Sequence, residues 1–229
     1  MSVVIVEYPI ILVNLKTYEE STSQKAIEFA RIAEKVNEKT GISIAIAPQT
    51  IDLAAVTVSS ETPVFAQHID PIIYGKNTGY ILPEAVTDAG AYGTLLNHSE
   101  HQIPLEQIDA SIKRAREVDL VTVVCADTVE TAKKVALLGP DMIAVEPPEL
   151  IGSGISVSTA QPEIVSGSVS AVRSINKEVN VLCGAGITNG EDASSALDLG
   201  AKGILVASGV VKAPDPYKAL LELARAMQR

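Results

Sequence analysis

Short apolar runs recur along the whole chain and contain almost no polar residues. They are rich in Val, Ile and Leu, and apolar positions do not alternate with polar ones within them. Both faces of each run are therefore expected to be buried, as in a parallel sheet that is covered by helices. This pattern predicts eight strands, at residues 10–15, 42–47, 63–66, 93–96, 120–125, 142–145, 179–183 and 203–206.

Segments with helical spacing separate these runs. The clearest is residues 23–39, where Ala26, Ala30 and Ala33 lie on one apolar side and charged residues lie on the other. Gly41, Gly139 and Gly200 each stand where a glycine would end a helix. The other predicted helices are residues 105–117, 129–138, 162–176, 190–199 and 216–227.

The regular alternation of strand and helix leaves two architectures, a closed barrel or an open doubly wound sheet. Eight units in 229 residues favour the barrel. An open sheet would more naturally carry a glycine-rich dinucleotide turn after its first strand, but Lys16, Thr17 and Tyr18 stand there. No linker or low-complexity tract divides the chain. We therefore predict that residues 1–229 form a single (β/α)8 barrel domain.

Composition and charge narrow the function classes. Apolar residues make up 47% of the chain, which is enough for a sizeable core. No apolar stretch approaches the roughly 18 to 20 residues that a membrane span needs, and residues 1–8 do not resemble a signal peptide. The net charge of −10 argues against binding of nucleic acid or anionic lipid. We expect a cytoplasmic protein that binds any anionic ligand through local groups.

The two cysteines, Cys125 and Cys183, each end an apolar run and are interpreted as small buried hydrophobic residues. If their runs are strands five and seven of one sheet, strand six lies between them. Their separation then exceeds the reach of a disulfide, about 7 Å between Cα atoms. Free thiols are typical of a cytosolic protein.

Polar residues at the carboxyl ends of the strands are the candidates for chemistry, because the active site of a barrel forms at that face. Asn14 and Lys16 end the first strand and, being two residues apart, point to the same side. The other candidate strand ends are Asn97, His98, Ser99 and Glu100 after strand four, Glu146 after strand six, Cys183 to Gly186 after strand seven, and Ala207 to Gly209 after strand eight.

Together these motifs resemble triosephosphate isomerase. The resemblance rests on Asn14-Leu15-Lys16, Asn97-His98-Ser99-Glu100, Glu146-Pro147-Pro148 followed by Ile151-Gly152-Ser153-Gly154, and Cys183-Gly184-Ala185-Gly186. Their order and spacing fit the family from the first strand to the last. The Glu-Pro-Pro-Glu-Leu-Ile-Gly motif and the short chain are most similar to those of the archaeal branch. The resemblance implies interconversion of D-glyceraldehyde 3-phosphate and dihydroxyacetone phosphate, in glycolysis and gluconeogenesis, without metal or cofactor.

The resemblance also implies roles for individual residues. Glu146 would be the general base, a role typically worth about 10² to 10⁴-fold in rate. His98 would polarise the substrate carbonyl as a neutral imidazole, for which triosephosphate isomerase is itself the standard worked example. Lys16, beside Asn14, would attract the phosphate and stabilise the oxyanion. Glu100 would hold Lys16 in a buried ion pair, and Thr78 would reach the partner subunit's Asn14.

Main-chain N–H groups would bind the phosphate, helped by a short helix after strand eight whose positive end points inward. Residues 147–154 resemble the lid of the family, which closes over the intermediate and keeps water away. The residues expected to bind substrate or phosphate are Asn14, Lys16, Ile151, Gly152, Gly184, Gly186, Ala207 and Ser208.

Residues 70–83, called the long loop below, exceed a typical connection between a strand and a helix. Their resemblance to a protruding loop of the family implies docking onto a second subunit. We expect a homodimer at least and favour a homotetramer, which is common among short archaeal members. His68 and His101 are interpreted as loop residues, and His101 stands where many family members have Arg or Asn.

Two other readings remain. One is a different sugar-phosphate barrel enzyme, an epimerase or a Schiff-base aldolase. Such epimerases generally use paired carboxylates with a metal, and the aldolase needs a lysine in strand six, where residues 142–145 contain none. The other is a non-catalytic phosphate-binding barrel. The presence of Glu146, His98, Asn14 and Lys16 argues against it.

Overall fold

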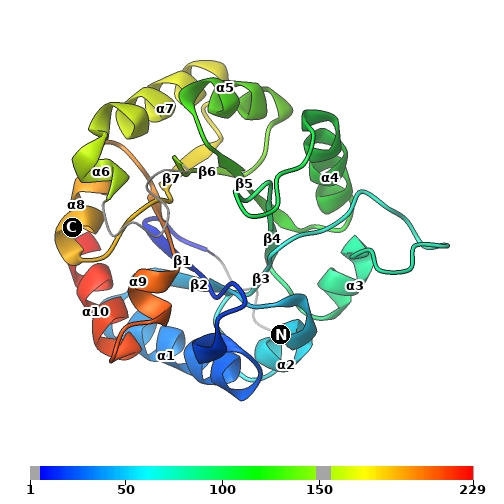
Figure 1. Cartoon of the computed structure of the whole chain (residues 1–229), viewed down its shortest axis with the longest axis horizontal. Helices are drawn as coiled ribbons and strands as arrows, with labels where there is room; N and C mark the ends of the chain where they lie inside the picture. The colour runs from blue at the N-terminus through cyan, green and yellow to red at the C-terminus, as the bar shows by residue number, and fades with distance from the viewer. Residues whose placement is uncertain (1–5, 148–155, 229) are drawn as a thin grey trace.

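Eight parallel strands form the centre of the computed structural model, which describes residues 6–147 and 156–228. The order of the strands in the sheet is β2-β1-β8-β7-β6-β5-β4-β3, and helices form a ring around them (Figure 1). This is the predicted (β/α)8 barrel. The strands are β1 (Ile10–Asn14), β2 (Ser43–Ala47), β3 (Phe65–Ala66), β4 (Gly93–Leu96), β5 (Val121–Ala126), β6 (Met142–Val145), β7 (Asn180–Cys183) and β8 (Gly203–Val206).

The barrel closes between its shortest strand, β3, and β2. A single parallel bridge joins Ile46 to Val64, and the Ile46 N–H donates to the Pro63 carbonyl oxygen at 3.0 Å. All eight predicted strands are present, and their ends differ from the predicted ends by at most two residues. The third strand is the exception in length, because only Phe65 and Ala66 pair in the ladder with β4.

All six helices predicted from periodicity are present, with ends shifted by at most one residue. Gly41 ends the first with φ +73°, and Gly139 ends another with φ +69°, so both occupy the left-handed region that favours glycine. Several helices of four to six residues have too few turns to show periodicity. The helices are α1 (Gln24–Thr40), α2 (Leu53–Thr57), α3 (Pro83–Asp88), α4 (Leu105–Glu117), α5 (Val129–Leu138), α6 (Val157–Ala160), α7 (Pro162–Ile175), α8 (Gly190–Asp198), α9 (Ser208–Val211) and α10 (Pro216–Met227).

Alternation along each strand divides the core into two clusters. One fills the barrel and includes Met142 and Ala144 of β6, and the other packs between strands and helices and includes Ile143 and Val145 of the same strand. The next residue, Glu146, continues the alternation toward the barrel axis. The fold therefore places a carboxyl group at the carboxyl end of the barrel interior.

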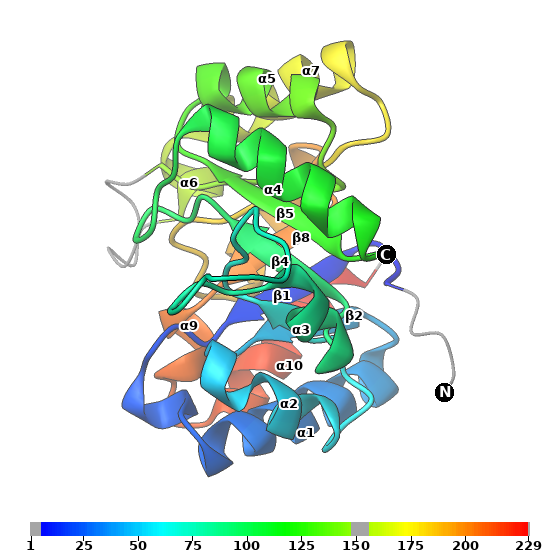
Figure 2. The ribbon, with the colours of Figure 1, turned by 90° about the vertical axis from the view of Figure 1, so that its right-hand side faces the viewer.

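The carboxyl ends of the strands form one face of the molecule. In Figure 2 this face lies on the left, where α6 and α9 follow strands β6 and β8. The predicted short helix after strand eight is α9. Cys125 and Cys183 are buried free thiols on β5 and β7, with β6 between them, as predicted. Within the described ranges, no helix has the length and apolar character to cross a membrane.

The long loop projects from the ring of helices just before α3 (Figure 1). Asp70 closes its base, since its side chain accepts a hydrogen bond from the Ile81 N–H at 2.7 Å and its own N–H donates to the Ile81 carbonyl. Arg114 of α4 donates to the Ile72 carbonyl at 2.9 Å and pairs with Glu84 of α3. The loop is thus fixed at its base while its tip is exposed.

Candidate active site

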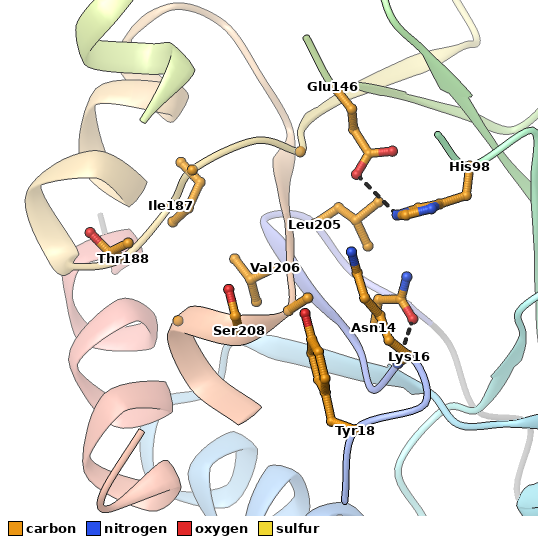
Figure 3. Close-up of a pocket in the computed structure, with 14 residues that line it drawn as sticks. Asn14, Lys16, Tyr18, His98, Glu146, Ile187, Thr188, Leu205, Val206 and Ser208 are labelled. Atoms are coloured by element: carbon orange, nitrogen blue, oxygen red, sulfur yellow. Dashed lines mark hydrogen bonds and ion pairs between the residues drawn. The ribbon is translucent and has the colours of Figure 1, made fainter. Parts of the chain in front are cut away.

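A cavity of about 200 Å³ opens at the carboxyl ends of the strands. Glu146 and His98 face each other on one side of it, Asn14, Lys16 and Tyr18 lie below them in the view, and Ile187, Thr188 and Ser208 lie on the opposite side (Figure 3). The lining residues are Asn14, Lys16, Tyr18, His98, Glu146, Gly184, Gly186, Ile187, Thr188, Leu205, Val206, Ala207, Ser208 and Gly209.

Glu146 is buried at the end of β6, with 4% of its surface exposed. Burial raises the pKa of its carboxyl group to about 7, since a charged carboxylate is poorly solvated there. A contact with the weak thiol donor of Cys125 and the positive charge of Lys16 lower this pKa, and the charge of Glu100 raises it further. The group is therefore poised to gain and lose a proton near neutral pH.

His98 lies opposite Glu146, with 3.6 Å between its Nε2 and Oε1 of the carboxyl group. The Glu100 N–H donates to Nδ1 of His98 at 3.1 Å. Nδ1 is thus an acceptor, and in the neutral ring the proton is on Nε2, which faces the cavity. Burial lowers the pKa of His98 to about 4, with a further lowering by the charge of Lys16 and an opposing effect of Glu100. The imidazole is neutral at physiological pH.

The turn that carries His98 is shaped by Asn97, which has a left-handed φ of +57°. Its side-chain amide donates to the Cys125 carbonyl at 2.9 Å, and its side-chain oxygen accepts from the Ile103 N–H at 3.0 Å. These two bonds tie the end of β4 to β5 and to the segment that leads into α4. They hold a backbone conformation that most side chains avoid.

Lys16 also has a left-handed backbone, with φ +47°, and its N–H donates to Oδ1 of Asn14 at 3.0 Å. Its ammonium group forms the predicted ion pair with Glu100, 2.7 Å from Oε1. The pair is only half buried, because the side chain of Glu100 is 59% exposed and that of Lys16 is 10% exposed. The expectation of a buried pair is therefore wrong for Glu100, and water screens the interaction on that side.

Gln67 supports this arrangement and was not anticipated from the sequence. Its side-chain amide, at the end of β3, lies 3.3 Å from Oδ1 of Asn14, 3.0 Å from the Lys16 carbonyl oxygen and 3.0 Å from the Ala47 carbonyl oxygen. It thus ties the ends of β1, β2 and β3 together. The available signal was its place at the end of a predicted strand, two residues from the buried Phe65.

Gly186, Ala207 and Ser208 line the side of the cavity opposite His98, and α9 begins at Ser208. Across the residues that the structure describes, no hydrogen bond uses the N–H of these three residues, so the groups are available to an anion. Gly184 differs, because its N–H donates to the Val145 carbonyl at 2.9 Å. It lines the cavity without a free amide to offer a phosphate.

The remaining predicted residues are Ile151, Gly152 and Thr78. Ile151 and Gly152 fall outside the described residues. Thr78 is exposed on the long loop and does not line the cavity of its own chain. Tyr18, Ile187 and Thr188 line it without having been predicted, because they follow the strand ends by several residues and belong to no motif that was recognised.

The arrangement suits proton transfer beside a carbonyl group. It combines a base with a pKa of about 7, a neutral imidazole N–H, a cation and free amides, all in a space that admits only a small molecule. Among the described residues, no three His, Cys, Asp or Glu side chains are grouped so that they could bind a metal ion. The donor set of a metal-dependent epimerase is not found in this part of the chain.

Comparisons with known proteins agree with this chemistry. The sequence model of the family described as triosephosphate isomerase matches residues 9–227. The chain is 54% identical to the triosephosphate isomerase of Methanocaldococcus jannaschii over 216 residues, 94% of this chain and 99% of that protein. It is 53% identical to that of Methanothermobacter thermautotrophicus over 215 residues, 94% of each chain.

Among solved structures, the crystal structure of triosephosphate isomerase from Bartonella henselae superimposes with a TM-score of 0.77. The alignment covers 97% of this chain and 100% of that one, at 16% sequence identity. At this level of identity the match concerns the fold alone. The similarity in sequence is to the two archaeal proteins.

Proposed function

The chain belongs to the triosephosphate isomerase family, in its archaeal-type branch, and from the geometry of its site we propose that Glu146 is the base and His98 the electrophile of the isomerisation. The reaction interconverts D-glyceraldehyde 3-phosphate and dihydroxyacetone phosphate. The observation that carries the assignment is the approach of Glu146 Oε1 to His98 Nε2, 3.6 Å, in the cavity that Lys16 also lines.

With the aldose as substrate, the Glu146 carboxylate takes the proton from the carbon beside the carbonyl group. The electron pair of the broken C–H bond forms the carbon–carbon double bond of an enediolate, and the carbonyl oxygen becomes negatively charged. A proton passes from the hydroxyl group of the first carbon to the former carbonyl oxygen. Glu146 then returns its proton to the neighbouring carbon, and the first carbon becomes the new carbonyl carbon. One carboxyl group can serve both carbons because they are adjacent, and its pKa of about 7 suits both steps.

His98 and Lys16 stabilise the developing oxyanion. The Nε2–H of a neutral imidazole donates a hydrogen bond to it, and triosephosphate isomerases are themselves the established example of a neutral histidine in this role. The Glu100 N–H on Nδ1 fixes the required tautomer at 3.1 Å. Lys16 adds a positive charge whose ammonium group Glu100 orients at 2.7 Å.

The phosphate binds at the opposite side of the cavity, where Gly186, Ala207 and Ser208 have available N–H groups. We keep residues 147–154 as the proposed lid on the basis of their sequence. Within this segment, Ile151 and Gly152 remain the proposed phosphate contacts. We retain no amide contact for Gly184. We also retain the cytoplasm as the expected location and a homotetramer as the expected assembly.

An isomerisation assay with glyceraldehyde 3-phosphate tests the proposal directly. Glu146→Gln keeps the size of the side chain and removes the base, so kcat should fall about 10² to 10⁴-fold. Glu146→Asp should also be slower, and 2-phosphoglycolate should inhibit the native protein. Glu178→Gln, an exposed change after α7, is the matched control and should be fully active. Native turnover in Glu146→Gln would remove Glu146 from the mechanism.

A further inference from the structure

Gly184 lies beside Glu146 on the neighbouring strand. Cys183 is paired with Val145 in the β6–β7 ladder, and the next residue on each strand is Gly184 and Glu146. The Gly184 N–H donates to the Val145 carbonyl at 2.9 Å and so fixes the two backbones against each other. The backbone of Gly184 is therefore held in register with the catalytic base.

The space that a side chain on Gly184 would need is filled by Glu146. A Cβ atom there would lie 2.5 Å from Cγ of Glu146, 3.3 Å from its Cδ and 3.2 Å from the Val145 carbonyl oxygen. Carbon atoms of different residues that touch without a covalent link normally stay about 3.5 to 4.0 Å apart. Any side chain at residue 184 would displace Glu146 from its present position.

Neither of the usual reasons for a glycine applies here. The φ of Gly184 is outside the left-handed region, so another residue could adopt this backbone. Its N–H is already bonded to Val145, so no anion requires close approach to that amide. The closest contact is the one with Glu146, whose carboxyl group is buried between the ends of β5 and β7 and faces His98.

We propose that Gly184 is a positioning residue for the base: its missing side chain leaves the space in which Glu146 lies buried with Oε1 3.6 Å from Nε2 of His98. An alanine at this position displaces the Glu146 side chain and so changes the position of its carboxyl group relative to Nε2 of His98. Gly184 then affects the proton transfer itself and not the binding of the phosphate, since it offers the phosphate no free amide.

The test is Gly184→Ala, compared with Gly167→Ala in α7. Gly167 is a matched control because an added Cβ there would meet its nearest atom, Cγ2 of Val129, at an ordinary 3.6 Å. We expect kcat of Gly184→Ala to fall on the order of 10 to 100-fold, as for a small displacement of a catalytic group. Its KM should stay within about threefold of native, because the predicted effect falls on the chemical step rather than on phosphate binding. Gly167→Ala should match the native protein.

The pH profile adds a readout that a general loss of packing would not change. If Glu146 moves to a less buried position, the acidic limb of kcat/KM should shift from about 7 toward the ordinary range of a glutamate. Native kcat in Gly184→Ala would overturn the proposal. So would a raised KM with native kcat, because that result would indicate a direct contact with substrate.

If Gly184→Ala fails to fold, Glu146→Ala is added, since it removes the Cγ atom that the new Cβ would meet. Folding restored in the double variant supports the proposal, and folding still lost overturns it, because the obstacle would then be the backbone at Val145. The proposal rests on the role of Glu146 given above. An active Glu146→Gln variant would remove that role, whereas a native-like Gly184→Ala variant would remove only the positioning.

Discussion

Burial of Glu146 serves the chemistry and opposes folding. The same desolvation that raises its pKa to about 7 makes the charged form less stable in the native state than in the unfolded chain. His98 changes in the opposite direction, to about 4, because burial also disfavours its cation. The two shifts leave a base that titrates near neutral pH beside an imidazole that stays neutral.

The raised pKa of Glu146 predicts that turnover depends on pH. We expect kcat/KM to fall about tenfold per pH unit below an apparent pKa near 7, since only the ionised Glu146 can accept a proton. His98 should add no second limb until the pH approaches about 4. Initial rates between pH 5 and 9 at constant ionic strength provide the measurement. A flat profile down to pH 5 would contradict the raised pKa.

The same raised pKa predicts that stability depends on pH. The folded-state pKa of Glu146, about 7, exceeds the ordinary 4.5, so its contribution to stability is complete below pH 4.5 and is lost as the pH rises to 7. The loss amounts to about 3 kcal/mol. Glu146→Gln does not titrate, so relative to native it should gain about this much stability between pH 4.5 and pH 8.

Urea unfolding of both proteins at these two pH values, at one protein concentration, measures the gain. Glu178→Gln is exposed and should show no such dependence on pH. If the difference in free energy of unfolding between Glu146→Gln and the native protein is the same at both pH values, the charge of Glu146 does not destabilise the folded state.

The strand ends bring the residues of the site together, and β3 is the shortest of the strands. It has two residues in the ladder and one bridge toward β2, so side chains must complete the closure of the barrel at this point. Gln67 does so through its amide, which reaches Asn14, the Lys16 carbonyl and the Ala47 carbonyl. Hydrogen bonds between strand ends thus support the catalytic residues where the ladder is short.

Gln67→Ala tests this role. We expect a loss of about 1 to 3 kcal/mol in the free energy of unfolding, because three part-buried hydrogen bonds between strand ends are removed. Turnover should also fall, since Asn14 and Lys16 lose a constraint. Gln107→Ala in α4 is the control, as no side-chain hydrogen bond is described for Gln107. Native stability and rate in Gln67→Ala would show that the remaining ladder fixes these strand ends alone.

For the whole molecule, the long loop is the feature that a closed barrel does not explain. Its base is fixed by Asp70 and Arg114, yet Ile73, Tyr74 and Tyr80 at its tip are 66%, 69% and 61% exposed. Exposed apolar side chains on a well-anchored protrusion are typical of a surface that binds a partner. This is consistent with the proposed self-association.

The prediction for assembly is that Ile73→Asp combined with Tyr74→Asp yields monomers, because two charges would enter an apolar contact. Light scattering on native and variant proteins measures the change. Leu137→Asp, an equally polar change on α5, is the control and should still form dimers at least. A native protein that is active and strictly monomeric would contradict the role of the loop.

The strands, the principal helices and the order of the motifs could be predicted from the sequence. These depend on periodicity and on residues close in the chain, such as the glycines that end α1 and α5. The sequence also placed Asn14, Lys16, His98 and Glu146 at one face, because the carboxyl ends of parallel strands share an edge. Family resemblance supplied their chemical roles.

Properties that depend on residues distant in the chain could not be predicted without the folded barrel. The pKa shifts of Glu146 and His98 arise from burial among several strands, and the exposure of Glu100 depends on how its turn meets the surface. Gln67 and Gly184 matter through contacts across the sheet, with Asn14 and Glu146 respectively. Local pattern carries no information on these contacts, because they form only when the barrel closes and brings separate strand ends together.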